Sequence, residues 1–247
     1  MYDAPAYLWA IIIAGPTAVA AVTSIVLYGG AVRAGLGRRR AALLAGVAAV
    51  VFGGWLTASA VIAGHGWYRT LPWFPVAAVG YLGLLLALRR IPVVARALAA
   101  PGMASRLELP HAPRMAGVAF LLYLALGRLP ALFALPAGLG DIAAGIAAPL
   151  VARRLTQGTG RGAALWFNAF GITDLVVALT LGALTGFGLV NVTPSSAPIT
   201  ELPLALIPTA TVPLLYVLHI TSLVTLRAPR PALSAAVPLP SGATPGN

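Results

Sequence analysis

The stretch that decides the fold is Tyr7–Gly29, which reads YLWAIIIAGPTAVAAVTSIVLYG and contains no charged residue. A helix needs about 20 mainly apolar residues to cross the hydrocarbon core of a membrane. Further apolar runs of this kind follow, at Ala41–Gly64, Leu71–Leu88, Met115–Phe133, Pro136–Ala152, Ala163–Phe187 and Leu202–Leu226. The sequence therefore predicts an all-α, polytopic membrane protein built as a bundle of seven transmembrane helices.

The composition supports a membrane protein and excludes several kinds of site. Hydrophobic residues make up 60% of the chain and charged residues 9%, whereas soluble domains carry about 25% charged residues. The sequence contains no cysteine, which excludes disulfides and thiolate metal sites. It also contains no lysine, so every one of its 16 basic residues is an arginine and Schiff-base chemistry is excluded.

The arginines predict an orientation. Fourteen of them follow the first, third, fifth and seventh predicted helices, while the other end has Arg69 together with Asp3 and Glu201. Because arginine-rich loops remain in the cytoplasm, we expect the N-terminus outside and the C-terminus in the cytoplasm. Richness in Ala, Gly, Arg and Pro resembles the codon bias of a high-GC bacterial genome, so we expect the plasma (inner) membrane of a bacterium as the location and the lipid bilayer as the partner. The net charge of +11 does not indicate nucleic acid binding.

The chain is expected to form one transmembrane domain with a short tail. The longest connection contains Ile91–Ala99, where apolar residues share one helical face with Arg96 on the other. This pattern predicts an amphipathic helix on the cytoplasmic membrane surface. The expected parts are a single bundle at 1–228, with three helices at 7–89, the connector at 90–114 and four helices at 115–228, and a disordered Pro- and Ala-rich tail at 229–247.

Charged residues inside the predicted spans are the first candidates for a site. We expect Arg128 and Asp141 at equal depth on either side of a hairpin turn near Leu135–Pro136, where they can pair. This pair is either a structural ion pair or a substrate or proton site that faces an outer cavity.

Asp174 is expected near the bilayer centre, with no arginine at its depth. An unpaired acid within a membrane indicates a proton-binding group or contact with a cation. The alternative is a neutral Asp174 that hydrogen-bonds the backbone of the last helix.

The last predicted helix contains Pro203, Pro208 and Pro213, each of which removes a helix hydrogen bond. The carbonyl groups freed in this way, together with Thr209 and Thr211, are candidate ion ligands, as in the broken helices of transporters. The alternative is a simple kink.

His219 and Asn168 are expected at similar depth on neighbouring helices, where they can form a hydrogen bond. His219 is otherwise a candidate proton carrier or haem ligand. His65 and His111 are expected in loops on opposite sides, so no shared metal site is predicted. We assign no catalytic residue and no cofactor.

Three segments resemble a family of uncharacterised bacterial multi-pass membrane proteins. They are Gly140-Asp141 through Pro149, Asn168-x-x-Gly171-x-x-Asp174-Leu175, and Pro208 through Pro213 to His219. The resemblance covers the last four predicted helices and implies no activity.

Four functions remain open from the sequence. The first is a transporter of a small solute or ion, coupled to protons through Asp174. The others are a sensory protein that binds a lipophilic ligand or haem, an enzyme that acts on lipid, and a structural membrane subunit. A second copy is a further expected partner, because Gly182 and Gly186 have the spacing of a helix-packing motif.

Overall fold

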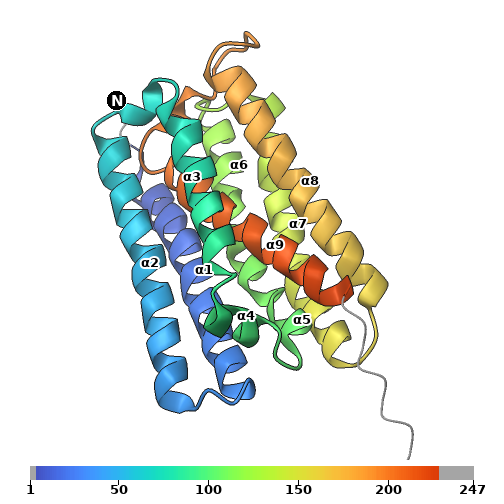
Figure 1. Ribbon diagram of the computed structural model, residues 1–247. Coiled ribbons are helices and arrows are strands. Elements are labelled where there is room, and N and C mark those ends of the chain that lie inside the picture. Colours follow the sequence, from blue (N-terminus) through green and yellow to red (C-terminus); the bar gives the residue numbers. More distant parts are fainter. Residues whose placement is uncertain (1–3, 228–247) are drawn as a thin grey trace, which may run out of the picture.

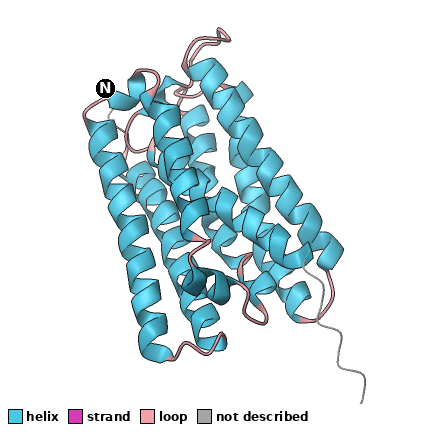
Figure 2. Cartoon of the chain, viewed as in Figure 1, coloured by secondary structure: helices cyan, strands magenta, loops and turns pink. Residues whose placement is uncertain are grey.

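The computed structural model describes residues 4–227, and within them every regular element is helical (Figures 1 and 2). The predicted tail at 229–247 lies outside the described residues. The long helices are α1 (Ala6–Arg33), α2 (Arg38–Gly64), α3 (Trp73–Leu88), α7 (Ala131–Thr156), α8 (Arg161–Gly186) and α9 (Val212–Arg227). The shorter ones are η1 (Trp67–Arg69), α4 (Pro92–Leu98), α5 (Met103–Arg106), η2 (Leu109–Gly117), α6 (Val118–Ala125), η3 (Ala197–Thr200) and the π-helical turn η4 (Ile207–Thr211).

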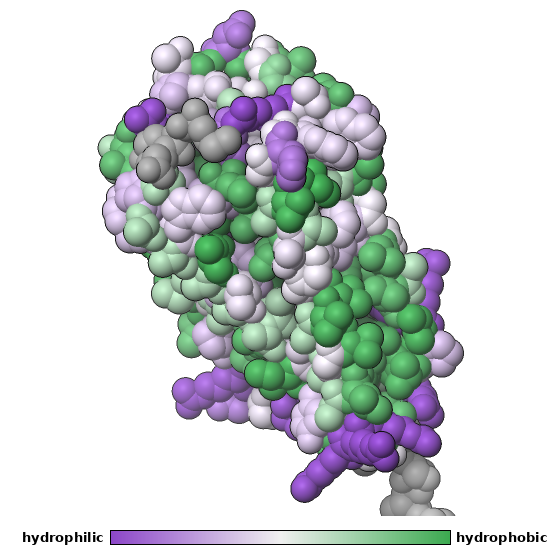
Figure 3. All heavy atoms as spheres, turned by 90° about the vertical axis from the view of Figure 1, so that its left-hand side faces the viewer, coloured by the Kyte–Doolittle hydropathy of each residue, from purple (hydrophilic) through white to green (hydrophobic). Residues whose placement is uncertain are grey.

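The apolar helices and their exposed hydrophobic side chains are compatible with an integral membrane protein. Large apolar side chains of α2 point outward, among them Leu43, Val47 and Val50. A broad apolar area separates the polar side chains gathered at the two ends of the molecule (Figure 3). Five helices within residues 4–227 are long and apolar enough to cross a membrane. A sixth span results if α3 and α4, bent by 85° at the break between them, count together.

α9 is the central helix of the bundle. In the most apolar 18 residues of Ile207–Arg227, which combines η4 and α9, 72% of the residues are buried. The corresponding share for α2 is 11%. α9 packs against α3 and α8, and its residues Leu214, Leu215 and Leu218 belong to a core cluster with Tyr81 and Leu85 of α3. Polar groups on α9 therefore face protein rather than lipid.

The prediction of one continuous fourth helix at Met115–Phe133 is wrong. α6 ends at Ala125, and a turn follows that contains Gly127 at φ +66° and the extended Pro130. A positive φ favours glycine, so Gly127 ends the helix, and Pro130 precedes the first residue of α7. α7 thus begins before Pro136, and the turn that was expected near Leu135–Pro136 lies at 126–130.

The connector between α3 and α6 is more deeply embedded than expected. The amphipathic helix predicted at Ile91–Ala99 is present as α4, and Arg96 is exposed. α4 packs against α1, where a Cβ on Gly30 would overlap the backbone of Ala97. The following segment, η2, runs into the bundle and packs against α1 and α7.

Candidate functional site

The candidate site begins with three polar residues at a spacing of three. Glu108, His111 and Arg114 lie at the start of and along η2, and all three are buried. A 3₁₀-helix has three residues per turn, so residues at this spacing lie one above another on the same face. Pro110 and Pro113 lie between them. η2 therefore presents a carboxyl group, an imidazole and a guanidinium in one row toward the interior.

Arg114 lies between two aspartates from two different helices. Its Nε donates to Oδ1 of Asp141 on α7 at 2.8 Å, and its Nη2 donates to Oδ2 of Asp174 on α8. The side chains of these residues are 1%, 15% and 8% exposed. One arginine thus links three segments through charge-assisted hydrogen bonds.

Glycines allow this close approach. A Cβ on Gly140 would overlap the carboxylate of Asp174, and one on Gly117 would overlap Asp141. A Cβ on Gly171 would overlap the imidazole of His219. Small residues bring membrane helices close together, and here they make room for the polar side chains themselves.

A histidine links Arg114 to a second part of the site. Nε2 of His219 lies 3.4 Å from Nη1 of Arg114, and its Nδ1 is 2.8 Å from Oδ1 of Asn168. The hydrogen bond predicted between Asn168 and His219 is confirmed. The His219 ring also stacks on His111, with ring centroids 3.8 Å apart.

Glu108 is linked to His219 through Asn168 and also bonds Ser222. Its Oε1 accepts hydrogen bonds from Nδ2 of Asn168 at 2.9 Å and from the hydroxyl of Ser222 at 2.6 Å. Its Oε2 and both ring nitrogens of His111 are buried without a hydrogen-bond partner among residues 4–227. We call the whole set the Arg114 network: Glu108, His111, Arg114, Asp141, Asn168, Asp174, His219 and Ser222.

Burial shifts the pKa values of Glu108 and His111, which lie outside the membrane-spanning segments. It raises the pKa of Glu108 to about 7, against the opposing effect of the hydrogen bonds from Ser222 and Asn168. Burial lowers the pKa of His111 well below its usual value, and the nearby His219 and Arg114 lower it further. Glu108 is therefore a proton-exchanging group near neutral pH, and His111 is neutral.

The charges around Arg114 do not balance if both Asp141 and Asp174 are ionised. Arg114 supplies one positive charge against Asp141 and Asp174, which leaves one negative charge in the interior. An uncompensated charge within a membrane costs several kcal/mol, of the order of 3 on insertion scales. The pair of carboxylates therefore favours binding of a proton or a cation.

Two small cavities border Asp141. One, of about 30 Å³, is also lined by Arg114 and Thr211, and the other, of about 40 Å³, by Phe133 and Pro208. A water molecule needs roughly 10–15 Å³ of such volume, so each cavity has room for at least one. Asp141 thus has space beside it in both cavities, and Arg114 in one of them.

The structure places the predicted site residues differently from our expectation. Asp141 pairs with Arg114, not with Arg128, which is exposed in the turn between α6 and α7. Asp174, expected without an arginine at its depth, pairs with Arg114 as well. His111 was expected in a loop, where it could not share a site with His219, but its ring stacks on that of His219. These three errors have one cause, because the segment from Glu108 to Arg114 was assigned to a cytoplasmic loop.

The proline-broken segment before α9 has satisfied carbonyl groups. The indole Nε1 of Trp55 donates to the Thr209 carbonyl at 2.8 Å, and the Leu204 carbonyl accepts from the backbone N–H of Ile207. The Thr209 hydroxyl bonds Ser59 in α2, away from the Arg114 network. Of the two predicted threonines, Thr211 therefore lies beside Asp141, and Thr209 belongs to a kink bonded to α2.

Metal ligation finds little support in this geometry. No group of three or more His, Cys, Asp or Glu side chains is arranged to hold a metal ion in the part of the chain that the structure describes. Both ring nitrogens of His219 face polar partners.

The motif that sequence reasoning missed is Glu108-x-x-His111-x-x-Arg114. Its signal was available, since three ionisable residues at a spacing of three, separated by prolines, fit one face of a 3₁₀-helix. The short length of the segment and its place after an arginine-rich stretch favoured a loop instead.

A comparison with known protein families matches residues 71–227 to a family described as Domain of unknown function (DUF8737). The match covers more than half of the chain and includes every member of the Arg114 network. No curated protein and no solved structure matches the chain.

Proposed function

This chain belongs to the family of unknown function DUF8737, and we propose that it is a proton-coupled transporter of a small solute. The observation that carries the proposal is Arg114, buried between Asp141 and Asp174 with one negative charge in excess. Intramembrane ionisable groups of this kind are typical of proton and ion pathways.

The proposed step is the loss of one of the two carboxylate partners of Arg114. A proton on Asp174 removes the charge that holds Nη2 of Arg114, and the guanidinium then remains with Asp141 alone. Because Asp141 is on α7 and Asp174 is on α8, protonation weakens a contact that ties α8 to η2. A two-state contact between helices is the kind of element that a bound proton can bias.

The proposed topology has seven passes, with the N-terminus outside and the C-terminus in the cytoplasm. We assign the pass beyond the candidate spans counted above to α6 together with the turn at 126–130 that follows it. The location that we propose is the plasma (inner) membrane of a bacterium. Most arginines lie near the ends of α1, α3, α7 and α9, which supports this orientation.

The small cavities favour this proposal over an enzyme that acts on lipid. Volumes of about 30 and 40 Å³ beside Asp141 leave no room for an acyl chain. They have room for water and therefore for proton transfer to this carboxylate.

The proton itself is the probe for the test. Purified protein is reconstituted into vesicles that contain a trapped pH dye, and a potassium gradient with valinomycin sets the membrane potential. Internal pH is followed with and without an external panel of amino acids, sugars, organic acids and metal ions. We expect a proton flux in the wild type that falls to the level of protein-free vesicles in Asp174→Asn.

The matched control is Glu201→Gln, which removes an acid that pairs with Arg69 at a partly exposed site. It should retain the wild-type flux. Asp174→Glu, which keeps a carboxyl group, should retain part of it and serves if Asp174→Asn does not fold. Equal flux from wild type, Asp174→Asn and protein-free vesicles across the whole panel would overturn the proposal.

A further inference from the structure

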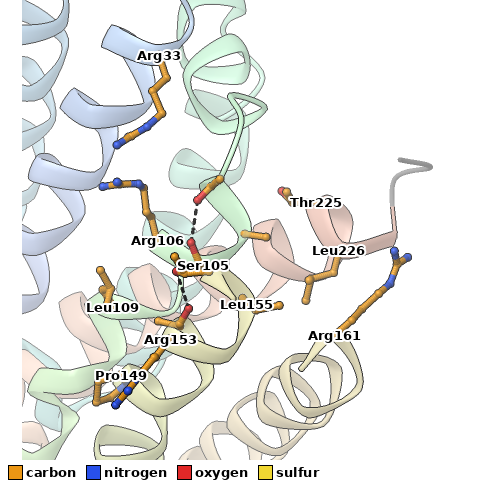
Figure 4. A pocket seen from close by; sticks show the side chains of 14 residues that line it. Arg33, Ser105, Arg106, Leu109, Pro149, Arg153, Leu155, Arg161, Thr225 and Leu226 are labelled. Atoms are coloured by element: carbon orange, nitrogen blue, oxygen red, sulfur yellow. Dashed lines mark hydrogen bonds between the residues drawn. The ribbon is translucent and has the colours of Figure 1, made fainter. Parts of the chain in front are cut away.

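A second concave site lies away from the Arg114 network, at the arginine-rich end of the molecule. It is a pocket of about 620 Å³ between the ends of α1, α5, α7, α8 and α9. Its lining includes Arg33, Arg106, Arg153 and Arg161 and no acidic residue (Figure 4). Pockets that hold organic ligands have about 300–1,000 Å³, so its size suits more than a single small ion.

Within residues 4–227, every acid has another partner and none pairs with these arginines. The sequence contains five acidic residues. Of these, Asp141 and Asp174 pair with Arg114, Glu108 bonds Asn168 and Ser222, and Glu201 pairs with Arg69. The fifth, Asp3, lies outside the described residues. Residues 228–247 contain no Asp or Glu.

Two of the four arginines converge. Arg33 and Arg106 extend toward one another in Figure 4, whereas Arg153 and Arg161 extend in other directions along the rim. A Cβ on Gly29 would lie 3.1 Å from Nη1 of Arg33 and 3.8 Å from Nη1 of Arg106. The two nitrogens are therefore within about 7 Å of each other, where like charges repel in a protein environment.

The proximity of Arg33 contributes to a lower pKa of Arg106. Partial burial, and then the charge of Arg33, lower the pKa of Arg106. Nη1 of Arg33 donates to the Gly29 carbonyl of its own helix at 3.0 Å, so only a neutral oxygen shares its charge there. A pair of converging guanidinium groups is the arrangement that binds an anion between them.

We propose that this pocket binds a phosphate-bearing anion, with Arg33 and Arg106 on the phosphate oxygens and Arg153 and Arg161 at the rim. Guanidinium groups match phosphate geometry through paired N–H donors. Leu155 and Leu226 add apolar wall, which suits the organic part of such a ligand. Basic pockets between transmembrane helices on the cytoplasmic side bind phospholipid head groups, and a soluble phosphorylated compound offers the same chemistry.

The test measures both sources on purified full-length protein. In the lipid arm, native mass spectrometry counts cardiolipin or phosphatidylglycerol retained by the protein, with phosphatidylcholine as the net-neutral comparison. In the soluble arm, inorganic phosphate and pyrophosphate are titrated, and the shift in melting temperature is measured. These readouts are independent of transport, so a failure here leaves the proposed function standing, and the reverse also holds.

The decisive comparison uses two double variants with equal loss of charge. Arg33→Gln with Arg106→Gln removes the converging pair, and Arg39→Gln with Arg96→Gln removes two exposed arginines that do not line the pocket. We expect the first to weaken binding by about tenfold or more relative to the second, as lost charge-assisted hydrogen bonds require.

Each outcome either identifies the source of the phosphate group or overturns the proposed site. Retention of anionic lipid without a response to pyrophosphate assigns a lipid head group, and the opposite result assigns a soluble phosphate compound. Equal binding by the two double variants would mean attraction by overall charge and would overturn the site, as would no binding in either arm. If the first double variant does not fold, Arg106→Gln is compared with Arg96→Gln in the same assays.

Discussion

At the scale of single residues, Arg114 is the one whose loss should cost most. Without it, Asp141 and Asp174 become two buried carboxylates with no counter-charge. Breaking a buried ion pair from one side costs about 3–5 kcal/mol. We expect Arg114→Gln to lower the melting temperature in detergent strongly, and Arg39→Gln, at an exposed site, to change stability by less than about 0.5 kcal/mol. Equal effects of both variants would contradict the assignment of the ion pairs.

Gly171 tests how tightly the site is packed. A Cβ there overlaps the His219 ring, which is itself held between His111 and Phe167. We expect Gly171→Ala to destabilise by about 1–3 kcal/mol, as overpacking does. Gly162→Ala, in the same helix with open space at its Cβ, is the control and should be neutral or stabilising by up to about 1 kcal/mol. Melting temperatures of the two variants check this, and a harmless Gly171→Ala would refute the close contact.

Glu108 makes stability depend on pH. Its pKa is raised from 4.5 to about 7 in the folded protein, chiefly by burial. Below pH 4.5 the carboxyl group is protonated in both states, and between pH 4.5 and 7 only the unfolded state loses the proton. The contribution of Glu108 to stability is therefore complete below the unfolded pKa and is lost as pH rises through the folded pKa, on the order of 3 kcal/mol in all.

The measurement is the melting temperature of wild type and Glu108→Gln between pH 4.5 and 8. The difference between the two curves isolates Glu108 from the other titrating groups. We expect the wild type to lose stability relative to the variant as pH rises toward 7, with a constant difference above it. A difference that does not change with pH would show that Glu108 is ionised in the folded protein throughout.

At the scale of elements, a hydrogen bond from Trp55 in α2 stabilises the proline-broken segment before α9. Pro213 has no N–H to donate to the Thr209 carbonyl, and the Trp55 indole donates to it from α2. We expect Trp55→Phe, which keeps an aromatic ring against Tyr81, to destabilise by roughly 1 kcal/mol. In a Pro213→Ala background the restored backbone N–H should reduce this cost. Equal costs in the two backgrounds, measured by thermal unfolding, would refute the coupling.

One short element, η2, explains why the candidate site could be predicted only in part. Hydropathy predicts long apolar helices well, and α1, α2 and α8 lie close to their expected ranges. The 3₁₀ segment η2 has no such signal, because it is short, contains two prolines and follows an arginine-rich stretch. Asp141, Asp174 and His219 were selected as intramembrane polar residues, but their common partner, Arg114, was assigned to a loop.

At the scale of the whole molecule, the two proposed sites share neighbouring residues in η2 and α9. The pocket of Arg33 and Arg106 includes Leu109, the residue after Glu108, and Thr225, one helical turn beyond Ser222. Glu108 and Ser222 are members of the Arg114 network. An anion in the pocket thus contacts the same chain segment that carries His111 and Arg114, so its binding and protonation of the network act on a shared element.

The orientation of the molecule decides which side of the membrane each site faces. Arginine-rich ends are retained in the cytoplasm, so the loop at Gln157 should be inside and the loop at Asn191 outside. The chain contains no cysteine, and both positions are exposed, so Gln157→Cys and Asn191→Cys each introduce one accessible thiol. A membrane-impermeant maleimide should label Asn191→Cys in intact cells and Gln157→Cys only after permeabilisation. The reverse pattern would invert the topology and place the phosphate pocket outside, and labelling of both in intact cells would mean that α8 does not cross the membrane.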